Sequence, residues 1–206
     1  WIIAFDPDRP HYIEVRRWYG TQAWEASPGE YYHNTTGELG GLWRHRGRAA
    51  QALVGVGTAA EGSDSSMPYL RKADSHNERV EFIFQGIGED EKIGDFGLIM
   101  RGAGGFEVDR ADVGLGTPPH ALVLATASGF SDEYNHVVEE ILNTNAWECG
   151  TKSPDVRADM VYFEGPKGGA VFSVGSIAWC GSLSHNNYNN NVSRITENVL
   201  RRFTSP

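Results

Sequence analysis

The strongest periodic signal lies near the end of the chain, where apolar residues recur at helical spacing. They fall at positions i, i+3, i+7 and i+11: Val192, Ile195, Val199 and Phe203. This spacing places them on one face of an α-helix, and the polar loop 187–191 before it ends in Asn191, which we expect to cap the first turn. Arg201 and Arg202 suit the negative end of such a helix.

Short runs rich in β-branched residues dominate the rest of the chain. They predict strands at 1–5, 11–17, 52–58, 79–87, 121–128, 157–164 and 169–176. The last two form a hairpin around 165–168, and the small and β-branched residues of 169–176 predict a central strand buried on both faces. The sequence therefore predicts a mixed α/β fold, a strand-rich sheet with few helices.

The remaining segments give weaker signals. Residues 61–79 read as a polar loop, and the glycine-rich stretch 94–116 offers one or two further strands. Ser131 and Asp132 can cap a second helix, whose apolar stripe would be Val137, Val138, Ile141 and Leu142.

The charge balance restricts the partners of the chain. Lys and Arg total 18 against 27 Asp and Glu, a net charge of −9. Such a chain repels phosphate backbones and anionic lipid, so nucleic acid and membrane surfaces are not expected partners. No apolar run reaches the roughly 20 residues that span a bilayer. Two cysteines make neither a disulfide framework nor a zinc pattern, and we expect a reducing, cytoplasmic environment.

The chain begins at Trp1, inside an apolar stretch, without methionine or a signal peptide. We expect residues 1–206 to form a single C-terminal domain, or domain fragment, of a larger subunit. The alternative is that the apolar start is simply a buried first strand.

Neither Cys180 nor Ser176 has the sequence context of a nucleophile. A nucleophile elbow places a glycine two residues before and two after the reactive residue, whereas Cys180 lacks the first glycine and Ser176 the second. We expect Cys180 to be a buried spectator thiol. A cysteine or serine hydrolase remains the less favoured alternative.

Two arrangements could contribute metal ligands. His136, Glu139 and Glu140 would share a helix face, and His76 and Glu78 form a His-x-Glu. Both sets are expected on solvated surfaces, because the first lies opposite an apolar stripe and the second lies in a charged loop.

The densest group of reactive side chains lies in the glycine-rich stretch 29–48. The candidates for lining a site are Tyr31, His33, Glu38, Trp43 and Arg44. Tyr and His could donate hydrogen bonds, Trp43 could form an apolar lid, and Arg44 could hold an anionic group. Aromatic and arginine side chains mark interfaces equally well, so an ordered loop or subunit contact is the alternative.

Three long stretches resemble the large (beta) subunit of bacterial N,N-dimethylformamidase, in its C-terminal part. They are residues 29–57, 111–129 and 157–203, and the likeness runs from Trp1 to about Phe203. The resemblance implies an amidohydrolase that turns N,N-dimethylformamide, a small linear amide, into dimethylamine and formate. It also implies a class I glutamine-amidotransferase-like domain, of which this chain would be the C-terminal portion.

The same resemblance implies ferric iron held by tyrosine phenolates and a glutamate, acting as a Lewis acid. The motifs expected to carry these ligands do not occur here, so no catalytic or metal-binding residue is transferable to this chain. We therefore expect the ligands upstream, and as partners the upstream part of the large subunit, a small subunit and further copies of the large subunit. The alternative is a non-catalytic assembly or binding module.

Overall fold

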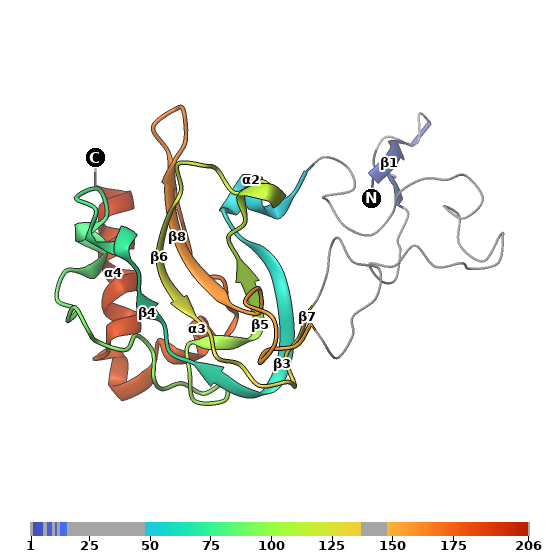
Figure 1. Cartoon of the computed structure of the whole chain (residues 1–206). Helices are drawn as coiled ribbons and strands as arrows, with labels where there is room; N and C mark the ends of the chain where they lie inside the picture. The colour runs from blue at the N-terminus through green and yellow to red at the C-terminus, as the bar shows by residue number, and fades with distance from the viewer. Residues whose placement is uncertain are drawn as a thin grey trace.

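A computed structural model of the chain describes residues 2–5, 8–9, 11, 13–15, 48–136 and 148–205 (Figure 1). Near the N-terminus, β1 (Ile2–Phe5) pairs with β2 (Ile13–Val15) in antiparallel fashion. This pair confirms the strands predicted within 1–5 and 11–17.

A four-stranded antiparallel sheet forms the centre of the fold, in the order β4-β6-β8-β9. Its strands are β4 (Leu70–Arg71), β6 (Leu122–Ala127), β8 (Ala158–Glu164) and β9 (Ala170–Ser173). Strand β6 and the β8–β9 hairpin were predicted from the sequence. The prediction that 169–176 is a central strand was wrong: β9 is an edge strand, and all four of its residues are half-buried because a groove between α2 and α4 runs beside it.

A three-stranded antiparallel sheet packs beside the first, in the order β5-β3-β7. It consists of β5 (Gly104–Arg110), β3 (Gly57–Met67) and β7 (Asn135–His136). The polar segment after residue 61 was predicted as a loop, but β3 continues through it to Met67. Ser66 and Met67 pair with Gly105 and Gly104 of β5, and the side chains of Ser63 and Asp64, before them, are exposed. The predicted helix after Ser131 does not begin there, since 135–136 pair with β3. The apolar stripe at 137–142 lies outside the described residues.

The described helices are short except for the last. They are α2 (Ala50–Val54), α3 (Ala178–Ser182), α4 (Asn191–Thr204) and the 3-10 turns η2 (Ala73–His76), η3 (Glu81–Phe84), η4 (Val113–Leu115) and η5 (His185–Tyr188). Two predicted strands are thus helical in part: 52–54 lie in α2, although 57–58 belong to β3, and 81–84 lie in η3. Residues 52–58 begin with α2, which ends at Gly55 with a left-handed φ of 82°. The apolar run at 79–87 forms η3, since Ile83 and Phe84 are buried consecutively rather than alternately.

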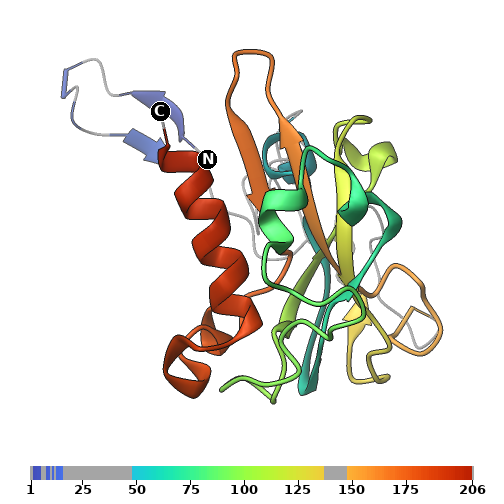
Figure 2. The ribbon, with the colours of Figure 1, turned by 90° about the vertical axis from the view of Figure 1, so that its left-hand side faces the viewer.

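Helix α4 runs beside the β8–β9 hairpin (Figure 2). Val192, Ile195 and Val199 are buried as predicted, whereas Phe203 is 43% exposed. The N-cap is Asn190 rather than Asn191: its side-chain oxygen accepts a hydrogen bond from the backbone N–H of Ser193.

The main core lies between α4 and the four-stranded sheet. The ring of Trp179 meets Tyr69 edge-on at 5.7 Å, and its Nε1 donates to Thr196 on α4. The whole is a mixed α/β fold that is rich in strands and poor in helices. Among the described residues no helix has the length and apolar character required to cross a membrane.

Candidate functional site

The loop candidates from the sequence cannot be placed. Tyr31, His33, Glu38, Trp43 and Arg44 all lie outside the described residues, and so do Glu139 and Glu140. The site predicted at 29–48 therefore stays a prediction.

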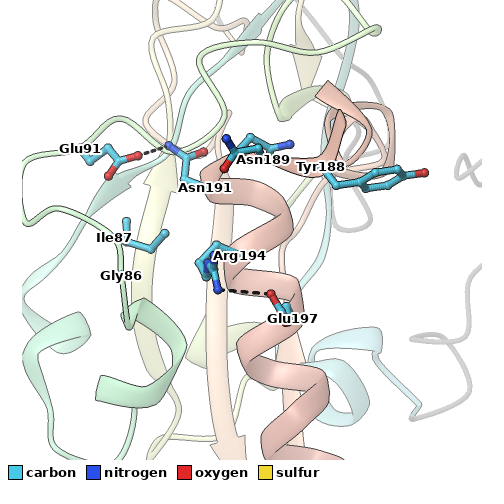
Figure 3. A pocket seen from close by; sticks show the side chains of 9 residues that line it. Gly86, Ile87, Glu91, Tyr188, Asn189, Asn191, Arg194 and Glu197 are labelled. Carbon is cyan, nitrogen blue, oxygen red and sulfur yellow. Dashed lines mark hydrogen bonds and ion pairs between the residues drawn. The ribbon is translucent and has the colours of Figure 1, made fainter. Parts of the chain in front are cut away.

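A polar pocket of about 260 Å³ lies beside the N-terminal half of α4 (Figure 3). One wall is the loop after η3, and the other is α4 with the loop before it. The lining residues are Gly86, Ile87, Glu91, Tyr188, Asn189, Asn190, Asn191, Arg194 and Glu197. The volume suits a small polar molecule.

The loop before α4 has an unusual backbone. Asn186, Asn187 and Tyr188 are three consecutive residues with φ between 48° and 65°. Asparagine tolerates this left-handed region, whereas a bulky side chain such as Tyr188 is strained there. Figure 3 shows the Tyr188 ring directed away from Glu91 and Ile87, so it forms the rim of the pocket rather than its floor.

The charged groups of the pocket are already engaged. Asn191 Nδ2 donates to Glu91 Oε1 at 2.7 Å, and Arg194 Nη1 lies 3.4 Å from Glu197 Oε2. Hydrogen bonds from Arg201 are the main reason that the pKa of Glu197 is lowered. A carboxylate held ionised is a weak general base near neutral pH. The pocket can thus bind a polar group, but the Glu197 carboxylate is not tuned for proton transfer.

A partly buried charged cluster joins the two sheets. Asp159 is 2% exposed and accepts hydrogen bonds from Thr126 Oγ1 at 2.8 Å, Arg157 Nε at 2.9 Å and the backbone N–H of Ala111 at 2.9 Å. Arg157 also donates to the carbonyl of Ala111. These contacts tie β8 to β6 and to the end of β5.

The second part of the cluster surrounds Arg110, which is 5% exposed. Its Nη2 donates to Asp112, its Nε lies 3.7 Å from Asp155, and its Nη1 lies 3.2 Å from His136 Nε2. The cluster (Arg110, Asp112, His136, Asp155, Arg157 and Asp159) was not predicted from the sequence. A repeated tripeptide could have revealed it, because Arg-Ala-Asp occurs at both 110–112 and 157–159.

The candidate nucleophiles are not activated. Cys180 is exposed, which corrects the prediction of a buried thiol: its neighbours Ala178, Trp179 and Ser182 occupy the buried face of α3. None of the described residues forms a hydrogen bond to its Sγ. The hydroxyl of Ser176 bridges the backbone N–H and carbonyl of Gly105. This hydroxyl therefore has a structural role.

The other cysteine, Cys149, is buried and donates from Sγ to Asp132 at 3.0 Å. The adjacent carboxylate raises the pKa of the Cys149 thiol, which keeps the sulfur protonated and unreactive. The same hydrogen bond, with those from Thr151, lowers the pKa of Asp132 to about 2.

The described residues do not fit the expected iron site. No group of three or more His, Cys, Asp or Glu among them could hold a metal ion, and His76 and Glu78 are exposed as predicted. Burial raises the pKa of Tyr69, Tyr134 and Tyr162, which disfavours the phenolate form. The hydroxyls of Tyr69 and Tyr134 donate to backbone carbonyls, and that of Tyr162 donates to a carboxylate.

Comparison with known proteins identifies the family. Residues 1–191 match the family described as N,N-dimethylformamidase beta subunit-like, C-terminal. The chain belongs to this family. It is 46% identical over 203 residues to the N,N-dimethylformamidase beta subunit of Paracoccus aminophilus and 45% identical over 203 residues to that of an Alcaligenes species. The resemblance seen in the sequence is thereby confirmed.

The family match covers much of the geometry described above. It includes the entire charged cluster and the pocket as far as Asn191. Each alignment covers 98% of this chain and 27% of the relative, so the chain spans about a quarter of the length of these beta subunits. The pocket and the cluster thus belong to the C-terminal region of such subunits.

Proposed function

We propose that the chain is the C-terminal part of an enzyme that hydrolyses N,N-dimethylformamide. Water would add to the amide carbonyl and the C–N bond would break, yielding dimethylamine and formate. The observation that carries this proposal is the identity of 45–46% to two N,N-dimethylformamidase beta subunits along 98% of the chain. The chain would supply a folded C-terminal unit to a site completed by other polypeptide.

The proposal includes a ferric iron bound outside the described residues, in which the hydroxyls of Tyr69, Tyr134 and Tyr162 are buried from solvent or hydrogen-bonded to other groups. The bound iron would supply Lewis-acid chemistry to the amide carbonyl. It also includes partners: the rest of the large subunit, a small subunit and further copies of the large subunit, in the cytoplasm. Because every described strand pair is antiparallel, the parallel strands of an amidotransferase-like domain would come from the rest of the subunit.

Within this proposal, the stretch 29–48 lines the mouth of the active site or a subunit contact. Replacing Arg44 with alanine should lower turnover in the assembled enzyme at least about tenfold if the guanidinium orients substrate. Lys167→Ala is the matched control, since Lys167 is exposed in the β8–β9 turn. Equal turnover for both variants would show that Arg44 does not orient the substrate.

The test of the proposed function is co-expression of the chain with the upstream part of the large subunit and the small subunit. This combination is called the assembly below. We expect the assembly to contain iron and to release dimethylamine and formate in equal amounts, while the 206-residue chain alone does neither. Hydrolysis and iron binding by the isolated chain would contradict the proposal.

A non-catalytic assembly module is the second candidate. Leu200 and Phe203 are 58% and 43% exposed beside an apolar groove, and exposed apolar surface of this kind marks interaction sites. An intact assembly that holds no iron and leaves dimethylformamide uncleaved would favour this candidate.

A further inference from the structure

An apolar groove of about 550 Å³ follows the free edge of β9. One wall is α4, which contributes Val199, Leu200 and Phe203. The other wall consists of Val54, at the end of α2, and Val56 just after it. Figure 1 shows α4 and α2 on opposite sides of the β8–β9 hairpin. The edge of the sheet therefore lies between two apolar walls.

The two walls are fixed to opposite faces of the hairpin. Ser173 Oγ donates to the carbonyl of Val54 at 2.7 Å, which anchors α2 to one face. On the other face, Phe172 packs against the main core, to which Trp179 and Val199 belong, and all three line the groove. Neither helix pairs with the backbone edge of β9, since a helix uses its own backbone groups internally.

The register shows which backbone groups of β9 point into the groove. Gly165 N–H donates to Gly169 O in the turn, and the pairs then alternate along the hairpin. Val171 and Ser173 thus bond to β8, whereas the N–H and C=O groups of Ala170 and Phe172 point outward. Among the described residues, β9 has no strand on this side.

Apart from its short length of four residues, strand β9 lacks the features that protect natural sheet edges. Its sequence, Ala-Val-Phe-Ser, contains no charge and no proline, and its pairing with β8 has no bulge. An unprotected apolar edge normally pairs with a further strand. Leu200 and Phe203 are exposed beside it, so the edge and its apolar wall are both available.

We propose that the groove binds an extended apolar strand from the rest of the beta-subunit polypeptide, which pairs with β9 and widens the four-stranded sheet. This inference rests on the proposed function. The relatives are nearly four times as long as the chain, which covers 27% of each, so most of their polypeptide is available to supply the strand. The added strand would bond to Ala170 and Phe172 and place alternate apolar side chains against α4 and α2.

Hydrogen exchange tests the pairing directly. In the assembly, the amides of Ala170 and Phe172 should exchange at least about tenfold more slowly than in the 206-residue chain alone. The amides of Val171 and Ser173, already bonded to β8, act as internal controls with a smaller change. Equal exchange at Ala170 and Phe172 in both samples would overturn the inference. Slow exchange that appears in the chain alone as its concentration rises would also overturn it, because a second copy would then occupy the edge.

Two surface variants test the apolar wall. Leu200→Glu places a charge in the groove and should reduce incorporation into the assembly at least about tenfold, whereas Leu98→Glu should have no effect. Both leucines are exposed, at 58% and 83%, so neither change disturbs the core. Normal incorporation of Leu200→Glu would contradict the proposal.

Turnover separates this inference from the proposed function. If the assembly hydrolyses dimethylformamide while the amides of Ala170 and Phe172 exchange rapidly, the proposed function stands and the added strand is rejected. If both amides exchange slowly and the assembly does not hydrolyse dimethylformamide, the added strand stands and the proposed function is rejected.

Discussion

Arg110 Nη1 lies 3.2 Å from His136 Nε2, and each residue is 5% exposed. Because a guanidinium can only donate, Nε2 must be the acceptor and the imidazole must be neutral. Burial, and next the charge of Arg110, lower the pKa of His136, while Asp155 and Glu148 act in the opposite direction. The pair thus favours the neutral form of His136.

This pair predicts an acid-sensitive fold. The unfolded chain would protonate His136 near its ordinary pKa of 6.5, whereas the folded chain would do so only at lower pH. The unfolded state binds more protons in that window, so the free energy of unfolding should fall as the pH drops below 6.5 towards the lowered pKa. Denaturant unfolding at a series of pH values measures this.

The matched variants for this prediction are His136→Gln and His76→Gln. Glutamine keeps an acceptor for Arg110 but does not titrate, so His136→Gln should flatten the stability profile below pH 6.5. His76 is the exposed comparison: its side chain is 49% exposed, with Nδ1 3.7 Å from Glu89 Oε1, and the fall in stability below pH 6.5 should persist in His76→Gln. If the unfolding free energy of His136→Gln falls with pH as steeply as that of the wild type, His136 is not the cause of the acid sensitivity.

Asp159 should be among the most sensitive positions for stability. Its carboxylate is buried and accepts from a guanidinium, a hydroxyl and a backbone N–H. Replacing it with alanine leaves these donors unmatched, and we expect a loss of about 3–5 kcal/mol in unfolding free energy. Thr126→Val removes one donor and should lose only about 1 kcal/mol. Similar losses for both variants would contradict this account.

Alanine substitutions at two glycines compare the cost of a left-handed backbone with the cost of crowding a new Cβ atom. Gly168 and Gly175 have φ values of 82° and 65°, but a Cβ at Gly168 meets nothing within 4 Å, whereas one at Gly175 would lie 2.6 Å from the carbonyl oxygen of Asp109. Gly168→Ala should therefore lose about 1–2 kcal/mol from the left-handed conformation alone. Gly175→Ala should lose at least about 1 kcal/mol more, because backbone atoms must move. Thermal unfolding of the two variants gives the comparison, and equal losses would show that no crowding occurs at Gly175.

The fold was predictable from the sequence where local pattern and tertiary environment agree. The strands at 121–128 and 157–164 and the C-terminal helix are of this kind. Residues 61–67 were missed because their polar side chains hide a strand that depends on pairing with β5 and β7, which lie far away in the sequence. Residues 79–87 were misassigned because a short apolar run fits a strand and a helical turn equally well.

The site was less predictable, because its parts are distant in sequence. Arg110 and Asp155 lie 45 positions apart, and local spacing carries no information about such pairs. The pocket combines Glu91 with Arg194, and neither residue has a distinctive motif around it. The family resemblance could be recognised because it rests on long contiguous stretches rather than on spatial neighbours.

Asn190 should stabilise both α4 and the pocket loop. Its side chain accepts from Ser193 N–H at 2.8 Å and donates to the carbonyls of Leu183 and His185 at 2.9 and 2.7 Å. Asn190→Ala should therefore lose about 1–2 kcal/mol in unfolding free energy. Asn189→Ala, with no side-chain hydrogen bond among the described residues, should stay within about 0.5 kcal/mol of the wild type. The opposite ranking in denaturant unfolding would refute Asn190 as the cap.

Cys180 should be dispensable for turnover. Its thiol is exposed, and no described base or cation forms a hydrogen bond to it, so that part of the chain places no general base beside the sulfur. Cys180→Ala in the assembly should keep the rate of formate release within about twofold of the wild type, and alkylation of Cys180 should have equally little effect. Covalent catalysis through this sulfur requires the opposite, a loss of several orders of magnitude while assembly is unimpaired. Such a loss would return Cys180 to the list of nucleophiles and make an iron-centred site outside the described residues unnecessary.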